Sequence, residues 1–168
     1  SGPRTEKVGG PPSHRVIEKG DLFLLDFSVV VAGYRGDFAN TFAVGAPPTS
    51  AQKRFFEACQ DAMAVGESML RPGARCAEID HAVRDSFATK HLAENFGSHV
   101  GHGLGLGHPD PPYIVPFSSD TLIAGDVVTL EPGQYIAGIA GMRIERNYLI
   151  TPAGYELLTR HDIRLEQT

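Results

Sequence analysis

The alternation of apolar and polar stretches along the chain predicts a pair of strands at its start. Residues 22–31 (LFLLDFSVVV) form an almost continuous apolar run, which indicates a buried strand. Ala32-Gly33 suits a two-residue turn, after which residues 34–44 return as a second strand. Residues 1–20 are polar and rich in turn formers, so we expect them to enter the first strand as an extended loop.

The middle of the chain has helical periodicity. Apolar side chains recur at three- and four-residue spacing, which predicts one helix over about residues 50–70, capped by Thr49 or Ser50. The same spacing predicts a second helix over about residues 77–90. Residues 97–118 are rich in Gly, His and Pro and are predicted to be mostly irregular.

A second strand pair is predicted near the end of the chain. Residues 126–135 and 142–150 have strand-like composition, and a turn centred on Gly138 joins them. The order strand pair, helix pair, strand pair favours an α+β fold with an antiparallel sheet. No internal boundary is visible, so residues 1–168 are interpreted as one domain.

Composition excludes several classes of partner. The formal net charge is −5, which argues against a nucleic-acid or anionic-membrane binder, because neither would find a basic surface. No apolar run is long enough to span a bilayer. Cys59 and Cys76 are the only cysteines and fall on apolar helix faces, so they are interpreted as core residues in a reduced, cytoplasmic protein.

Two aspartates fall inside the first strand pair. With Ala32-Gly33 as the turn, Asp26 lies opposite Ala39, and Asp37 points to the same face as Ala39. Carboxylates in an apolar strand are costly unless they are paired or bind a cation. The alternative is that Asp26 bonds backbone amides in a bulge and Asp37 is a turn residue. Taken alone, this pair favours the alternative.

The second strand pair repeats this pattern with glutamates. A turn centred on Gly138 places Glu131 and Glu145 opposite each other on one face. A buried salt bridge with Arg143 or Arg146 is the alternative, and it explains one glutamate more easily than both.

The segment SHVGHGLGLGH (residues 98–108) adds His99, His102 and His108 among glycines that allow close approach of the backbone. A lone histidine is more often structural than a ligand, but three beside four strand acids favour a site. Carboxylates with an imidazole suit two divalent cations such as Mn, Co, Fe or Zn. A structural zinc site would instead favour cysteines.

These motifs together resemble the pita-bread metallopeptidases, which comprise methionine aminopeptidases, Xaa-Pro aminopeptidases and prolidases. The resemblance covers residues 1–159 and is carried by the following stretches: LLDFSVVVAGYRGD, GHGLGL, DPPYI, AGDVVTLEPGQYI and GMRIERNYLITPAGYELLT. The later stretches are more similar to the Xaa-Pro aminopeptidase and prolidase branch. In this family the metal ligands are Asp, Asp, His, Glu and Glu in chain order. The matching positions here are Asp26, Asp37, His102, Glu131 and Glu145.

The resemblance implies the pita-bread (creatinase/aminopeptidase) fold, an α+β fold with a curved antiparallel sheet and helices on its outer face. It also implies that the fold begins upstream of Ser1. We therefore expect its N-terminal portion to be a separate polypeptide or to have been cut away, leaving an open sheet face near residues 1–30. The expected partners are a short peptide substrate and either a second copy of the chain or that N-terminal portion, with no nucleic acid or membrane.

The resemblance further implies two divalent metal ions, with Mn expected and Co, Zn or Fe as alternatives. The implied reaction is hydrolysis of an N-terminal peptide bond, of the Xaa-Pro aminopeptidase or dipeptidase type, by a metal-bridging hydroxide. Glu131 is the candidate for moving the proton of the water. His108 is the first candidate, and His99 the second, for stabilising the reacting carbonyl.

The chain also departs from the family pattern. Pro109 stands where a second histidine is expected, one residue after His108, and Gly9 stands where an upstream histidine is expected. Smaller departures surround the ligands, at Ser28, Asn40 and Arg146. These changes favour an alternative function, a metal-binding pseudoenzyme or a peptide-binding module on the same fold. A different C–N hydrolysis, as in creatine amidinohydrolase, is a third reading.

Overall fold

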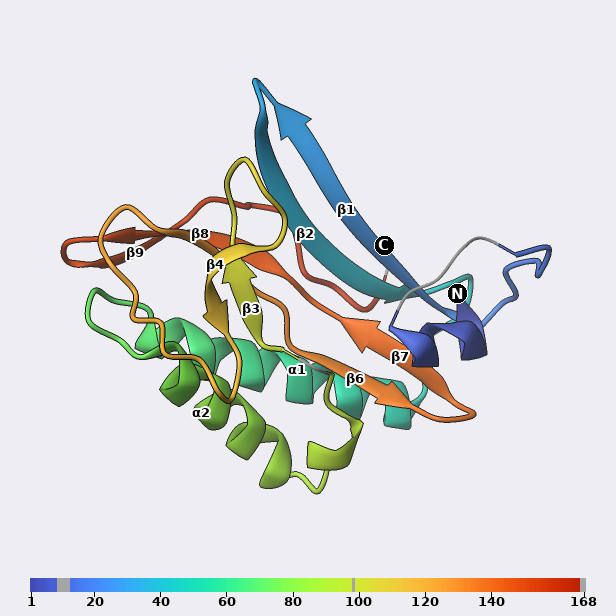
Figure 1. Cartoon of the computed structure of the whole chain (residues 1–168). Coiled ribbons are helices and arrows are strands. Elements are labelled where there is room, and N and C mark those ends of the chain that lie inside the picture. Colours follow the sequence, from blue (N-terminus) through green and yellow to red (C-terminus); the bar gives the residue numbers. More distant parts are fainter. Residues whose placement is uncertain (9–12, 98, 167–168) are drawn as a thin grey trace.

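The computed structural model describes residues 1–8, 13–97 and 99–166. Two helices lie together on one side of the antiparallel strands, and a long strand pair projects on the other side (Figure 1). The elements in chain order are η1 (Gly2–Lys7), β1 (Leu22–Val31), β2 (Tyr34–Ala43), α1 (Ser50–Met69), α2 (Cys76–Ala88), η2 (Ala93–Asn95), β3 (Gly101–Gly103), β4 (Asp110–Ile114), β5 (Val127–Leu130), β6 (Gly133–Ile136), β7 (Ala140–Arg143), β8 (Arg146–Thr151) and β9 (Gly154–Leu157).

The β1–β2 hairpin has the predicted register. Val31 pairs with Tyr34 and Asp26 pairs with Ala39, with no shift along the ladder. Both turn residues, Ala32 and Gly33, have positive φ (52° and 88°), as expected when the turn follows the right-handed twist of the strands. Asp26 therefore does not lie in a bulge.

The second predicted strand pair is divided, so the prediction of two continuous strands is wrong. β5 ends at Leu130 and β8 begins at Arg146, where both join the sheet β4-β3-β5-β8-β9, whereas β6 and β7 form a separate hairpin. Pro132 cannot donate a backbone hydrogen bond, which ends the first ladder. The amide of Glu145 instead donates to the carbonyl oxygen of Ala39 in β2, at 3.0 Å.

The glycine-rich segment is also more ordered than predicted, because β3 and β4 lie within residues 97–118. Gly101 packs so closely on β5 that a Cβ there would stand 1.9 Å from the carbonyl oxygen of Thr129. Some glycines of this segment therefore permit close strand contact rather than a turn.

The two helices begin and end close to the predicted positions. Thr49 and Gln52 form a capping box at the start of α1, in which the Gln52 amide donates to the Thr49 hydroxyl and the Thr49 amide donates to the Gln52 side chain. Cys59 and Cys76 are buried and unpaired, as predicted. The helices pack their apolar faces against the sheet, and the largest buried apolar side chains include Phe87, Ile79, Ile114, Leu122, Leu130, Met142, Ile144 and Ile150.

β1 is not the buried strand that its composition predicts. Its buried position is Leu22, whereas Phe27 and residues 29–31 are exposed, reaching 72% at Val31. The reason is that β2 is the only strand paired with β1 among the described residues, so one edge and one face stay open. This hairpin extends beyond the other strands (Figure 1), and the expected open sheet face near residues 1–30 is present.

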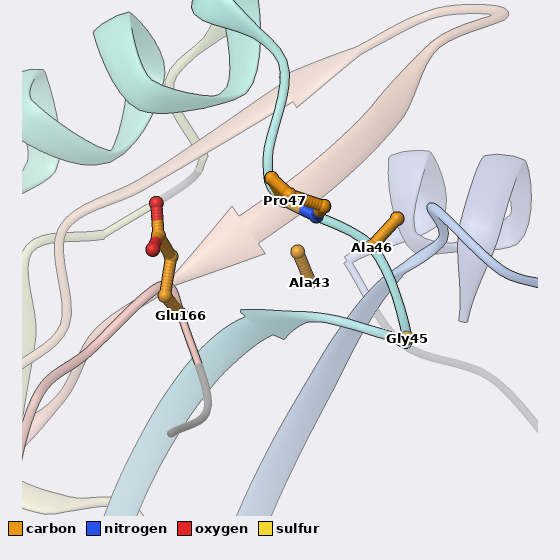
Figure 2. A pocket seen from close by; sticks show the side chains of 5 residues that line it. All are labelled: Ala43, Gly45, Ala46, Pro47 and Glu166. Atoms are coloured by element: carbon orange, nitrogen blue, oxygen red, sulfur yellow. The ribbon is translucent and has the colours of Figure 1, made fainter.

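A recess of about 400 Å³ lies where β2 leads into α1 (Figure 2). It is lined by Ala43, Gly45, Ala46, Pro47 and Glu166, none of which belongs to the predicted ligand set. Within the described ranges, no helix has the length and apolar character needed to cross a membrane.

Candidate metal centre

The predicted ligands converge from the open hairpin and from the breaks between strands. Asp26 and Asp37 share one face of the β1–β2 hairpin, and Glu145 reaches them from the β7–β8 break. Carboxylate oxygens of these three residues all lie within 4.8 Å of one another. Asp37 and Glu145 are almost fully buried, whereas Asp26 stays partly exposed.

His102 joins this cluster to Glu131. Its Nδ1–H donates to the carbonyl oxygen of Gly103 at 2.8 Å, because a carbonyl can only accept. The Nε2 atom then carries the lone pair, 3.4 Å from a Glu131 oxygen and 3.7 Å from an Asp37 oxygen. This tautomer suits an Nε2 metal ligand.

The two candidate catalytic histidines lie on opposite sides of the cluster. His99 Nε2 is 2.9 Å from the Glu131 carboxylate. His108 Nε2 contacts the Asp37 carboxylate directly, although Pro109 occupies the expected histidine position. Their ligand atoms fall into two further groups within 4.8 Å, one of Asp37, His102 and His108 and one of His99, His102 and Glu131. Gly9 lies outside the described residues.

Arg143 makes a double contact whose extent sequence reasoning missed. Its guanidinium donates to Glu131 at 2.9 Å and also contacts Asp26. The alternative prediction of a buried salt bridge is thus confirmed for Glu131. It is wrong for Glu145, whose carboxylate accepts a hydrogen bond from the Thr129 hydroxyl at 2.8 Å. The only feature of the sequence that could have indicated this double contact is the position of Arg143, two residues before the predicted ligand Glu145.

Two of the residues that depart from the family pattern, Asn40 and Arg146, contact other parts of the fold. The Asn40 amide donates to the carbonyl oxygen of Arg164 at 3.1 Å. The Arg146 guanidinium lies 3.6 Å from Glu67 on α1. Neither contact involves a predicted ligand.

Burial and like charges set the protonation of the carboxylates. Burial raises the pKa of Glu145 to about 9, with the charges of Glu131, Asp37 and Asp26 acting in the same direction. Burial also raises the pKa of Asp26, although Arg143 opposes the shift. At Glu131 burial acts to raise the pKa, but His99 and Arg143 outweigh it and hold the pKa below its usual range.

This donor set fits divalent cations. Asp26, Asp37 and Glu145 form one group of oxygen ligands within 4.8 Å, and His102 lies in a second such group with Glu131. These are the hard and borderline ligands that such ions prefer. Positive charge at this place would also relieve the repulsion that raises the Glu145 pKa.

Comparison with known proteins identifies the family of this chain. Metallopeptidase family M24 matches residues 1–152. The chain belongs to metallopeptidase family M24. A relative, the uncharacterized peptidase YqhT of Bacillus subtilis, is 39% identical over 159 residues, which cover 95% of this chain and 45% of YqhT.

Solved structures of similar proteins show the same architecture. A prolidase from Thermococcus sibiricus superposes with a TM-score of 0.94 at 32% identity, covering 98% of this chain and 45% of the prolidase. An Xaa-Pro dipeptidase from Bacillus anthracis gives 0.93 at 36% identity, covering 98% and 46% respectively. This M24 chain therefore has the pita-bread fold and spans less than half the length of these relatives.

We expect Glu145→Gln to have opposite effects with and without metal. Protonated Glu145 stabilises the fold fully below its unfolded pKa near 4.5, and this contribution is lost as pH rises toward about 9. With EDTA at pH 8, the neutral glutamine should therefore raise the free energy of unfolding by on the order of 2 kcal/mol. With Mn²⁺ it should lower this free energy, because a charged ligand is lost. Urea unfolding at pH 5 and pH 8, with EDTA and with Mn²⁺, measures both effects. A change of the same sign with EDTA and with Mn²⁺ would contradict the ligand role.

Proposed function

We propose that this chain carries the metal centre of a peptidase that hydrolyses N-terminal bonds of short peptides, with Xaa-Pro substrates preferred. The observation that carries the proposal is the convergence of five predicted ligands from separate elements: Asp26, Asp37, His102, Glu131 and Glu145. The relatives described as a prolidase and an Xaa-Pro dipeptidase support the substrate class.

The side chains of the centre would have different roles in hydrolysis. Two divalent cations, with Mn expected, would supply a water of lowered pKa and polarise the peptide carbonyl. Glu131 would accept the proton of the attacking water and pass it to the leaving amine. His99 and His108 would donate N–H groups to the oxygen on which negative charge develops. Arg143 contacts Glu131 and Asp26 and so keeps two of the carboxylates in place.

A pseudoenzyme or peptide-binding module is the second candidate. Arg143 already pairs with Glu131, the residue assigned to proton transfer, and Pro109 replaces an expected histidine. Both features favour binding without turnover. The two candidates differ in hydrolysis and agree in metal binding.

We also propose a partner for the open face of β1: the polypeptide that corresponds to the half of the M24 relatives this chain does not span. Phe27, Val29, Val31 and Tyr34 share one exposed face of the hairpin, which is an unusual run of apolar side chains to leave in water. Added strands from such a partner would satisfy the open backbone groups of β1 and cover this face. The relatives are about twice as long as the stretch they share with this chain, which leaves ample chain for that role.

Hydrolysis of Xaa-Pro dipeptides by the Mn²⁺-loaded chain, alone and mixed with the unmatched part of YqhT, tests the enzymatic proposal. We expect turnover that EDTA abolishes. Glu131→Gln should lower kcat by about 100-fold or more, because the proton acceptor is lost. Glu78→Gln, at an exposed position of α2, serves as the control and should leave kcat unchanged. Bound metal without turnover in either sample would overturn the proposal and favour the binding module.

The partner proposal is tested by light scattering after size-exclusion chromatography. The chain and the unmatched part of YqhT should form a 1:1 complex. Val29→Lys should weaken the complex by about tenfold or more, because it places a charge in an apolar interface. Ile123→Lys, at an exposed apolar position outside the hairpin, is the matched control. No complex, or a homodimer of the chain alone that Val29→Lys disrupts, would overturn the proposal.

A further inference from the structure

A fully buried carboxylate lies outside the metal centre. Asp80 on α2 has no exposed surface, although a charged group in this position is costly unless it is paired. Its partner is Arg84, one helical turn later, whose Nε lies 2.5 Å and whose Nη2 lies 3.3 Å from the two carboxylate oxygens. This two-point contact fixes the plane of the guanidinium.

Arg84 uses the rest of its guanidinium to hold the segment that leads to His99. Its Nη1 donates to the carbonyl oxygen of Gly97 at 3.4 Å. The guanidinium carbon also lies 4.6 Å from the centre of the Phe96 ring, in cation–π contact. Phe96 in turn packs on Phe87 of α2, with ring centres 5.2 Å apart.

The opposite side of this segment is also tightly packed. A Cβ at Gly97 would come within 3.2 Å of the Tyr135 ring, so Tyr135 packs closely against Gly97, whose carbonyl oxygen accepts from Arg84. Phe96 and Gly97 line a narrow cavity together with His99 and Glu131.

We propose that the Asp80–Arg84 pair is a positioning device that sets His99 against Glu131. This inference rests on the proposed function, because it assigns Arg84 a role in the same reaction through His99. Simple helix stabilisation would not require a buried acid, since an exposed pair at this spacing serves that purpose. The buried pair instead gives Arg84 one orientation, in which it reaches Gly97 and Phe96.

The first test does not depend on catalysis. In protein labelled with ¹⁵N-histidine, the His99 side-chain resonances are identified by their loss in His99→Ala. Arg84→Lys keeps the positive charge but loses the planar contacts, so it should shift or broaden the His99 resonances. Phe96→Leu, which leaves the buried ion pair intact, should act in the same direction. Glu78→Gln, on the same helix, should leave them unchanged, and His161 serves as the internal reference.

The second test is a double-mutant cycle on Xaa-Pro hydrolysis. Arg84→Lys should lower kcat/KM by about tenfold, mainly through kcat, in the wild-type background. In the His99→Ala background the same substitution should have almost no effect, because Arg84 acts through His99.

Unmoved His99 resonances in both Arg84→Lys and Phe96→Leu would overturn the inference, as would equal losses of kcat/KM in the two backgrounds. If the chain binds metal but hydrolyses nothing, the proposed function fails, and the resonance test still decides the positioning role.

Discussion

The repulsion between four carboxylates held at one place is the constraint on which the rest of this structure depends. Asp26, Asp37 and Glu145 would separate in water, yet the strands bring their oxygens within 4.8 Å of one another. Glu131 is linked to this group through His102, and all of these acids but Asp26 are buried. Burial, together with these like charges, raises the pKa of Glu145 to about 9. Such a cluster is stable only with compensating positive charge, and Arg143, which pairs with Glu131 and Asp26, supplies part of it.

The fold meets this constraint by taking the aspartates and the glutamates from two different kinds of position. The two aspartates are placed by the ladder of a regular hairpin, whereas both glutamates stand where a ladder is broken. From its break Glu145 reaches the two aspartates, and its amide bonds to β2, whereas Glu131 contacts His99, His102 and Arg143. The helices pack behind the sheet, and α2 supplies Arg84, which fixes the approach to His99.

Sequence patterns correctly predicted the features of this structure that depend on residues close together in the chain. The turn at Ala32-Gly33 set the register of Asp26 and Asp37, and the periodicity of the helices set their bounds within a few residues. The predictions that were wrong or incomplete concern features that depend on residues far apart in the chain. The apolar run of β1 predicted burial, but burial needs a covering element and not only composition. The sequence indicated Arg143 as a salt-bridge partner of a glutamate, but its second contact, with Asp26, was missed, as was the role of Arg84, because folding alone brings these residues together.

The central claim is that Asp26, Asp37, His102, Glu131 and Glu145 bind two cations. Anomalous diffraction from crystals of the Mn²⁺-loaded chain tests it most directly. The account predicts two anomalous peaks about 3.5–4 Å apart among these side chains. Asp37→Asn should weaken or abolish at least one peak, while Glu78→Gln should keep both. A single peak, or manganese bound away from these carboxylates, would contradict the account.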